Sequence, residues 1–282
     1  MATLESADGA CADVYLHGAH VTSWRPAPDC EERLFLSARS EFRDTAAIRG
    51  GIPVIFPQFA TEGPLPRHGF ARTSLWSLHS VEHDDEGDTV ATFKLDDSPA
   101  THAIWAAEFT LTLTVRVGGA RLQVMLGVEN TGASPFSFAA ALHTYVRVND
   151  AERAEVVGLQ GARYRESSAP TLLHVDDVRA VRAMGPLDRV YVHAPRFVTL
   201  REPERSLGVE MMDFTDIVLW NPGAEAARGL ADMEPHGERA MMCIEAAVVQ
   251  PPVTLASGGR WSGAQKLDAA LFTLSADGKV AR

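Results

Sequence analysis

Two apolar segments of the chain each contain one ionisable side chain that could carry out acid–base chemistry. His143 lies within residues 138–146 and Glu245 within residues 241–249, and both segments otherwise consist mainly of small or apolar residues. A buried carboxylate is costly unless it has a partner or a function, and burial raises its pKa towards the range of a general base. The alternative for Glu245 is an exposed strand residue or an ion pair with an arginine.

Arg49 lies in a loop whose composition predicts a rigid, irregular backbone. Two glycines follow it directly, and Pro53 and Pro57 come within the next eight residues. Glycine permits unusual backbone angles and proline fixes them, so such a loop can hold a ligand close to the main chain. The alternative is a surface turn with a solvated arginine.

A second basic segment, residues 65–72, contains Arg67, His68 and Arg72 next to Gly69. Guanidinium groups match the geometry of phosphate oxygens, so these residues are candidates for binding a small anion. In an extended chain Arg67 and His68 point in opposite directions, and the spacing alone does not establish a shared site. The alternative is a loop with two exposed arginines and one structural histidine.

The remaining histidines and cysteines favour structural roles over metal binding. His17 and His20 have the spacing of helical ligands but lie between a strand-like run and a glycine turn, with no cysteine or carboxylate to complete a ligand set. Cys11, Cys30 and Cys243 are odd in number and follow no metal-ligand spacing. They are typical of reduced thiols in a cytosolic compartment, and we expect no metal site.

Apolar residues recur mostly with a period of two, which is typical of half-buried antiparallel strands. The clearest run, residues 109–117, continues across Gly118 and Gly119 into a second run at 121–129 and predicts a hairpin. Other runs lie at 13–16, 33–36, 89–95, 196–201, 207–212, 216–219, 240–248 and 269–274, whereas only residues 224–230 suggest a helical turn. Many short strands with turn residues between them predict an all-β sandwich or barrel.

Length and charge narrow the class of protein. The chain has 282 residues, enough to bury a full core, and its even composition predicts a single domain over residues 1–282. Its formal net charge of −11 argues against nucleic acid or anionic lipid as a partner, but leaves room for a small anion bound by a few arginines. The first residues resemble no signal peptide and no run of 18 apolar residues occurs, so we expect a cytoplasmic location.

Six short motifs, in order along the chain, resemble the branch of the aldose 1-epimerase family that acts on hexose 6-phosphates. They are IRGGIPV at 48–54, RHGFAR at 67–72, LHTY at 142–145, DRVY at 188–191, VLWNP at 218–222 and CIE at 243–245. The resemblance implies a large antiparallel β-sandwich of the galactose-mutarotase type. It also implies a cofactor-free, monomeric enzyme that interconverts the α and β anomers of a hexose 6-phosphate.

The resemblance also implies roles for individual residues. His143 matches the catalytic histidine of the family and Glu245 its catalytic glutamate, which we expect to act as acid and base respectively. The positions matching substrate contacts are Arg49, Arg67, His68, Arg72 and Asp188. Position 67 is glutamine in some relatives.

Two other classes of protein are alternatives. One is a sugar-binding β-sandwich without catalysis, which would lack the histidine or the glutamate that this chain retains. The other is a glycoside hydrolase, which needs a second carboxylate about 5–9 Å from Glu245. Asp188, Asp213 and Asp216 are the candidates for that second carboxylate.

Overall fold

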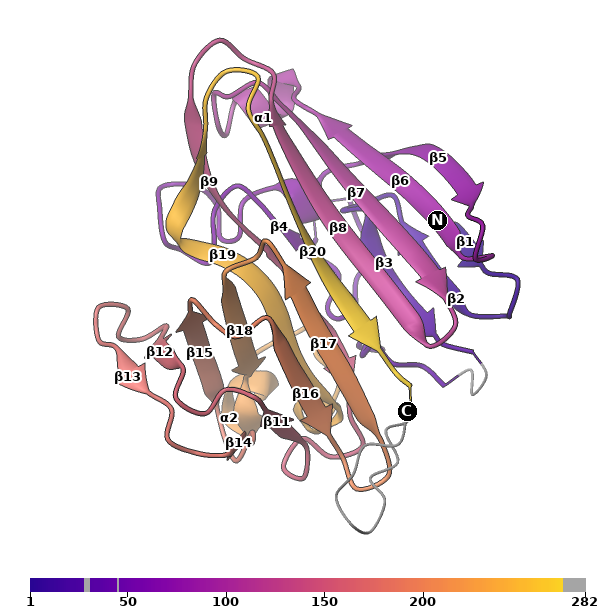
Figure 1. Cartoon of the computed structure of the whole chain (residues 1–282). Coiled ribbons are helices and arrows are strands. Elements are labelled where there is room, and N and C mark those ends of the chain that lie inside the picture. Colours follow the sequence, from indigo (N-terminus) through magenta and orange to yellow (C-terminus); the bar gives the residue numbers. More distant parts are fainter. Residues whose placement is uncertain (28–30, 45, 271–282) are drawn as a thin grey trace.

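Antiparallel sheets dominate the computed structural model, which describes residues 1–27, 31–44 and 46–270 (Figure 1). An eight-stranded sheet has the order β13-β12-β15-β18-β19-β9-β4, with β10 also paired to β19. Its strands are β4 (Val54–Ile55), β9 (Phe136–Leu142), β10 (Tyr145–Arg147), β12 (Arg163–Glu166), β13 (His174–Val175), β15 (Leu187–Val192), β18 (Asp216–Asn221) and β19 (Met241–Leu255). Glu245 lies on β19 of this sheet and Asp188 on β15, and His143 lies between β9 and β10.

A nine-stranded sheet and a three-stranded sheet contain the other strands of the described residues. The nine-stranded order is β14-β11-β16-β17-β20-β8-β7-β6-β5, and the small sheet is β1-β2-β3. The larger of the two contains β5 (Ser77–His83), β6 (Thr89–Asp96), β7 (Phe109–Gly118), β8 (Arg121–Asn130), β11 (Glu155–Val157), β14 (Ala180–Val181), β16 (Phe197–Arg201), β17 (Ser206–Met212) and β20 (Arg260–Asp268). The smaller contains β1 (Ala2–Glu5), β2 (Cys11–Tyr15) and β3 (His20–Arg25).

Helices are short and lie between strands. They are α1 (Pro99–His102), α2 (Gly223–Arg228) and two 3₁₀ turns, η1 (Ala71–Thr73) and η2 (Gly237–Ala240). The helical turn expected at residues 224–230 is therefore confirmed as α2, whereas α1 was not predicted. Ser98 and Thr101 form a capping box that explains α1, and a box over so few residues gives little periodicity to detect.

The predicted hairpin is present, with its turn one residue later than expected. Phe109 pairs with Asn130 and Gly118 with Arg121, so Gly118 belongs to β7 and the turn consists of Gly119 and Ala120. Gly119 has a φ of 58°, a left-handed conformation that glycine adopts at little cost. Burial alternates along β7 as the sequence predicts.

Two of the predicted strand runs are wrong in part or in whole. Residues 33–36 form only isolated bridges, Leu34 with Val146 and Leu36 with Gly50, so the segment pairs at single positions with two different partners and not along a ladder. The run expected at 269–274 fails at residues 269 and 270, which follow the end of β20, and its other residues lie outside the described part of the chain.

One hydrophobic core contains residues of both large sheets. Leu113 of β7 and Leu126 of β8 belong to it, together with Leu142 of β9, Leu219 of β18 and Ile244 of β19. Because side chains alternate between faces, the neighbours of these residues in β9, β18 and β19 point to the opposite face of the eight-stranded sheet. That opposite face carries His143 and Glu245.

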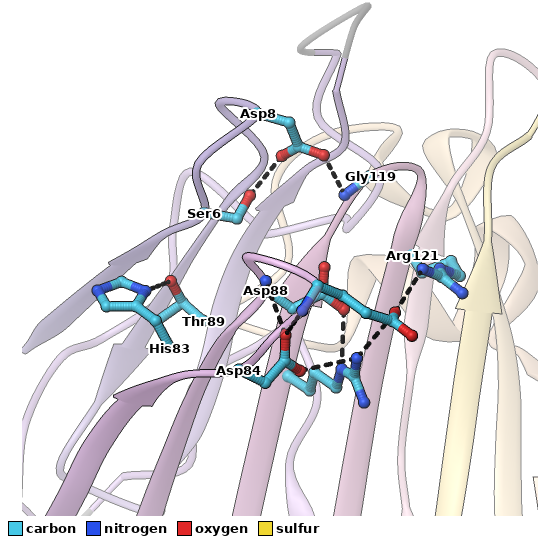
Figure 2. A network of polar contacts seen from close by, with 10 residues as sticks. Ser6, Asp8, His83, Asp84, Asp88, Thr89, Gly119 and Arg121 are labelled. Carbon is cyan, nitrogen blue, oxygen red and sulfur yellow. Dashed lines mark hydrogen bonds and ion pairs between the residues drawn. The ribbon is translucent and has the colours of Figure 1, made fainter.

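A polar network joins the turns at one end of the nine-stranded sheet (Figure 2). Asp84 accepts a hydrogen bond from the backbone N–H of Asp88 at 3.1 Å, and Arg116 of β7 pairs with Asp88 at 2.8 Å. Asp8, in the turn after β1, accepts a hydrogen bond from the backbone N–H of Gly119 at 2.6 Å. The network ties the N-terminal strands to the β7–β8 turn, and it contains none of the predicted site residues.

Candidate active site

Strand register places His143 directly opposite Glu245. Leu142 pairs with Ala246 in the β9–β19 ladder, and Tyr145 pairs with Cys243 in the β10–β19 ladder. The two ladders share one register, so the residues between them are opposite one another and share a face. Two residues 102 positions apart in the sequence are thus neighbours because of sheet pairing alone.

His143 lies in a break between β9 and β10 and not within one continuous strand. The N–H of His143 donates a hydrogen bond to the carbonyl of Pro53 at 3.0 Å. Proline has no N–H to continue a ladder, so regular pairing stops at this point. The break leaves the register intact, because Ile244 donates a hydrogen bond to the Thr144 carbonyl at 3.0 Å.

The His143 and Glu245 side chains form a close buried pair. Nε2 of His143 lies 3.4 Å from Oε1 of Glu245, and the two side chains are 9% and 2% exposed. Nδ1 of His143 and Oε2 of Glu245 are buried without a hydrogen-bond partner among the described residues. Buried polar atoms are rarely left unpaired, and two at one place are typical of a site that a ligand completes.

Burial shifts both members of the pair towards their neutral forms. It raises the pKa of Glu245 well above its usual value, and the nearby charge of Asp188 acts in the same direction. It lowers the pKa of His143 well below its usual value, with His68 and Arg72 adding to the effect. The pair therefore holds one proton over a broad pH range around neutrality, so it contains one acid and one base.

Two apolar clusters on the same sheet face account for this burial. The first consists of Ile55, Phe59, Ala141, Val190, Val218, Ala247 and Val249. The second consists of Phe35, Tyr145, Ala227, Met233, Met241 and Cys243. His143 and Glu245 lie in the registers between the two, at a point where low polarity strengthens interactions between charges.

His68 presents a neutral N–H donor beside the pair. The backbone N–H of Ala60 donates to its Nδ1 at 3.2 Å, which leaves the proton of a neutral ring on Nε2. Burial, together with the charges of Arg72, Arg67 and Arg49, lowers the pKa of His68 to about 3, so the ring is neutral at physiological pH. Its centre is 5.8 Å from that of the His143 ring.

The three predicted arginines converge near His68, since all three act on its pKa. Arg49 donates to the hydroxyl of Tyr145 at 3.0 Å and pairs with Asp232 at 3.1 Å. The next residue, Gly50, has a φ of 115°, and a Cβ there would lie 2.3 Å from the carbonyl oxygen of Phe35. Close packing of the main chain therefore fixes the loop, as its composition predicts.

Arg72, unlike Arg49, forms no ion pair with a carboxylate among the described residues. It donates to the backbone carbonyl of Arg67 at 3.1 Å, whereas Arg67 itself is exposed. Burial, opposed in part by Tyr145, and the charges of Arg49 and Arg67 lower the pKa of Arg72 to about 10. Cations that repel one another in this way favour the binding of an anion.

Asp188 borders the pair from β15. It pairs in register with Trp220, which pairs with Cys243, two residues before Glu245. Its carboxylate accepts a hydrogen bond from the Ser167 hydroxyl at 2.5 Å. Asp188 is exposed, yet partial desolvation by its surroundings raises the pKa of its carboxyl group.

The other two acids considered for a hydrolase have different surroundings. Asp216 is buried and accepts backbone hydrogen bonds from His193, Val249 and Gln250, so its carboxylate serves the fold. Asp213 is exposed in the turn between β17 and β18. Of the three, only Asp188 influences the pKa of Glu245.

The structural role expected for the N-terminal histidines is confirmed. Nε2 of His17 lies 2.9 Å from the carbonyl oxygen of Ala46, and Nε2 of His20 lies 2.7 Å from that of Gly50. Cys243 and Cys11 are free thiols, while Cys30 lies outside the described residues. Within the described ranges, no group of three or more His, Cys, Asp or Glu side chains could hold a metal ion.

Two residues of the site were not predicted from the sequence. Tyr145 stacks on the His143 ring with centroids 4.8 Å apart and planes 9° apart. Its position two residues after His143 in an apolar segment was a detectable signal, because alternate residues of a strand share a face. Asp232 pairs with Arg49 from the loop after α2, and nothing local in the sequence marks it.

Comparison with known proteins shows that the chain belongs to the aldose 1-epimerase family, whose model matches residues 1–268. A relative from Cenchrus ciliaris is 34% identical over 94% of this chain and 83% of its own length. Another, from Escherichia coli, is 34% identical over 84% of this chain and 79% of its own length. Both carry the name "Putative glucose-6-phosphate 1-epimerase".

Solved structures confirm the galactose-mutarotase type of β-sandwich. A crystal structure of a "putative mutarotase" from Salmonella typhimurium has a TM-score of 0.86 at 28% identity, and the match covers 94% of this chain and 88% of that one. A galactose mutarotase related enzyme from Lactobacillus acidophilus has a TM-score of 0.76 at 16% identity, over 95% and 96% of the two chains, and shares the fold. The described residues include no helix both long and apolar enough to cross a membrane.

Proposed function

We propose that the protein is a mutarotase that interconverts the α and β anomers of a hexose 6-phosphate, with glucose 6-phosphate as the first substrate to test. Membership of the aldose 1-epimerase family supports the reaction, and the names of the relatives support the phosphorylated substrate. The observation that carries the proposal is the buried His143–Glu245 pair beside Arg72, whose pKa burial and the charges of Arg49 and Arg67 lower.

Ring opening uses the pair as one base and one acid. With the shared proton on His143, the Glu245 carboxylate takes the proton of the C1 hydroxyl while the imidazolium protonates the ring oxygen. The C1–O5 bond breaks, its electrons go to O5, and C1 becomes an aldehyde. Rotation about C1–C2 presents the other carbonyl face, and the same transfers run in reverse to close the ring.

Proton transfer is the only exchange in these steps, so they require no cofactor. Each step of closure reverses a step of opening, so both groups must give and accept protons. They can do so because lowering of the pKa of His143 and raising of the pKa of Glu245 leave one proton to pass between the two groups. Each such group typically contributes about 10²–10⁴ in rate.

The surrounding residues would hold the sugar and its phosphate. The neutral His68 offers its Nε2–H to a sugar oxygen, and Asp188 accepts hydrogen bonds from sugar hydroxyls. Arg49 and Arg72 form charge-assisted hydrogen bonds to the phosphate, and the exposed Arg67 adds its charge from the rim. A monomeric state and a cytoplasmic location stay predictions.

The test compares anomer exchange of glucose 6-phosphate with that of glucose by two-dimensional exchange NMR. We expect kcat/KM for the phosphorylated sugar to be higher by at least about 100-fold, since two charge-assisted contacts are lost with the phosphate. Equal or faster exchange of glucose or galactose would refute the phosphate assignment. Release of reducing sugar from oligosaccharides would instead indicate a hydrolase.

A further inference from the structure

Tyr145 connects the two halves of the proposed site, the acid–base pair and the arginine cluster. Its ring stacks on His143, and its hydroxyl accepts a hydrogen bond from Arg49 at 3.0 Å. We propose that Tyr145 is a positioning residue that fixes His143 relative to Arg49, so that a substrate held by its phosphate presents its ring to the acid–base pair. This inference rests on the proposed function and extends it.

Aromatic contacts, rather than hydrogen bonds, set the plane of the His143 ring. Nδ1 of His143 has no partner among the described residues, so no second hydrogen bond orients the imidazole on that side. The Tyr145 ring lies nearly parallel to it, and Trp220 meets it edge-on with centroids 5.9 Å apart. Trp220 also packs against Tyr145 with centroids 6.0 Å apart, so the three rings pack against one another as one group.

Hydrogen bonds fix the other end of the Tyr145 side chain. Burial raises the pKa of Tyr145, so its hydroxyl is neutral and accepts the N–H of Arg49. Arg49 is held in turn by Asp232 at 3.1 Å. Burial acts to lower the pKa of Arg49, but Tyr145 and Asp232 more than offset it, so the guanidinium stays charged.

A rigid connection suits a rigid substrate. In a pyranose 6-phosphate the phosphate and the anomeric carbon are separated by the sugar ring, so the protein must hold its anion site and its acid–base pair at a matching separation. Misplacement by about 1 Å can cost 10²-fold in rate. One aromatic ring that touches both His143 and Arg49 sets that separation with few rotatable bonds.

The same sheet provides a matched control. Tyr191 of β15 is also buried, and its hydroxyl donates to Asp176 at 2.6 Å and lies 3.4 Å from Arg189. It belongs to the main core on the opposite face and contacts none of the predicted site residues in the described structure. Loss of the Tyr191 hydroxyl shows how much activity is lost when a tyrosine is removed from a hydrogen-bonded group with Asp176 and Arg189 that lies outside the site.

The experiment measures anomer exchange of glucose 6-phosphate and glucose with the wild type, Tyr145→Phe and Tyr191→Phe. Phenylalanine keeps the stacking and removes only the hydroxyl. Because a hydrogen bond to a charged group is lost, we expect Tyr145→Phe to reduce kcat/KM for glucose 6-phosphate roughly tenfold and that for glucose by no more than about twofold. Tyr191→Phe should leave the ratio of the two substrates unchanged.

A double-mutant cycle shows whether Tyr145 acts through Arg49. In an Arg49→Gln background, Tyr145→Phe should have little further effect, whereas fully additive losses would overturn the inference. The inference would also be overturned if the wild type prefers glucose 6-phosphate and Tyr145→Phe leaves the ratio of kcat/KM for glucose 6-phosphate to that for glucose unchanged. That result would leave the proposed function intact. A wild type without that preference would overturn both.

Discussion

Arg165 of β12 donates hydrogen bonds to both carboxylate oxygens of Glu62, at 2.7 and 2.8 Å, across 103 residues of sequence. The Arg165 side chain is 1% exposed, whereas that of Glu62 is 36% exposed. Glu62 lies in the loop that carries Arg67 and His68, and the two bonds between Gln58 and Leu65 are internal to this loop. The ion pair therefore ties the loop to the eight-stranded sheet.

Substitution of either partner should reduce activity, but the two substitutions should affect stability to different extents. Glu62→Gln leaves a buried charge poorly compensated and should lower the free energy of unfolding by about 3 kcal/mol, whereas Arg165→Met removes that charge and should cost less. Both should reduce kcat/KM, because His68 is less firmly placed. Urea unfolding and anomer exchange measure the two effects. Equal destabilisation by Glu62→Gln and Arg165→Met, with full activity in both, would contradict this role. The control is Arg189→Met, which removes an arginine on the opposite face of the sheet.

Replacement of Glu245 by glutamine should stabilise the protein. Burial raises the pKa of Glu245 in the folded state, so the folded protein binds this proton more tightly than the unfolded chain does. Ionisation therefore costs stability progressively as the pH rises above the unfolded value of 4.5. At neutral pH Glu245→Gln should gain about 1–2 kcal/mol, as is common when a functional group is removed.

The pH dependence of the Glu245→Gln effect provides its check. Thermal unfolding followed from pH 4 to pH 8 should show little difference between variant and wild type at the acid end and a growing difference above it. A constant difference over the whole range would show that ionisation of Glu245 is not its cause.

The turnover rate should be nearly independent of pH around neutrality. Burial lowers the pKa of His143 below 6.5 and raises that of Glu245 above 4.5, so the one-proton form of the pair extends in both directions. We expect kcat to fall in acid as the pair gains a second proton and in alkali as it loses its last one. A single titration with a midpoint at 6.5 would argue against a buried, coupled pair.

Removal of the Arg72 charge should affect binding of the phosphate more than the chemistry. Arg72→Gln loses a charge-assisted contact, so KM for glucose 6-phosphate should rise about tenfold or more while exchange of glucose is preserved. Arg260→Gln, which alters an exposed arginine paired with Glu129 on the nine-stranded sheet, is the matched control. A similar loss for both sugars would indicate that Arg72 serves the fold instead.

The sequence predicted most of the fold because its strands alternate clearly. Phe109 to Val117 has an apolar residue at every second position, and the structure buries those residues. The segment at residues 33–36 shows the limit of this approach, because Leu34 and Leu36 form only isolated bridges there. Local pattern does not report whether a short run finds a partner strand.

The predicted site residues were found one by one, and their arrangement was not predictable. Glu245 was identified because a carboxylate in an apolar strand is costly, and its burial is confirmed. Its pairing with His143 depends on a register between distant strands, which no local signal encodes. The same reason explains why Asp232 was missed, since its relation to Arg49 exists only in three dimensions.

Anomer exchange of glucose 6-phosphate by Glu245→Gln and His143→Ala, measured by two-dimensional exchange NMR beside the wild type, tests the central claim most directly. Each variant removes one of two acid–base groups, so each should lower kcat by about 10²–10⁴ while remaining folded by circular dichroism. Wild-type rates in both variants would contradict the assignment of His143 and Glu245 as the catalytic pair.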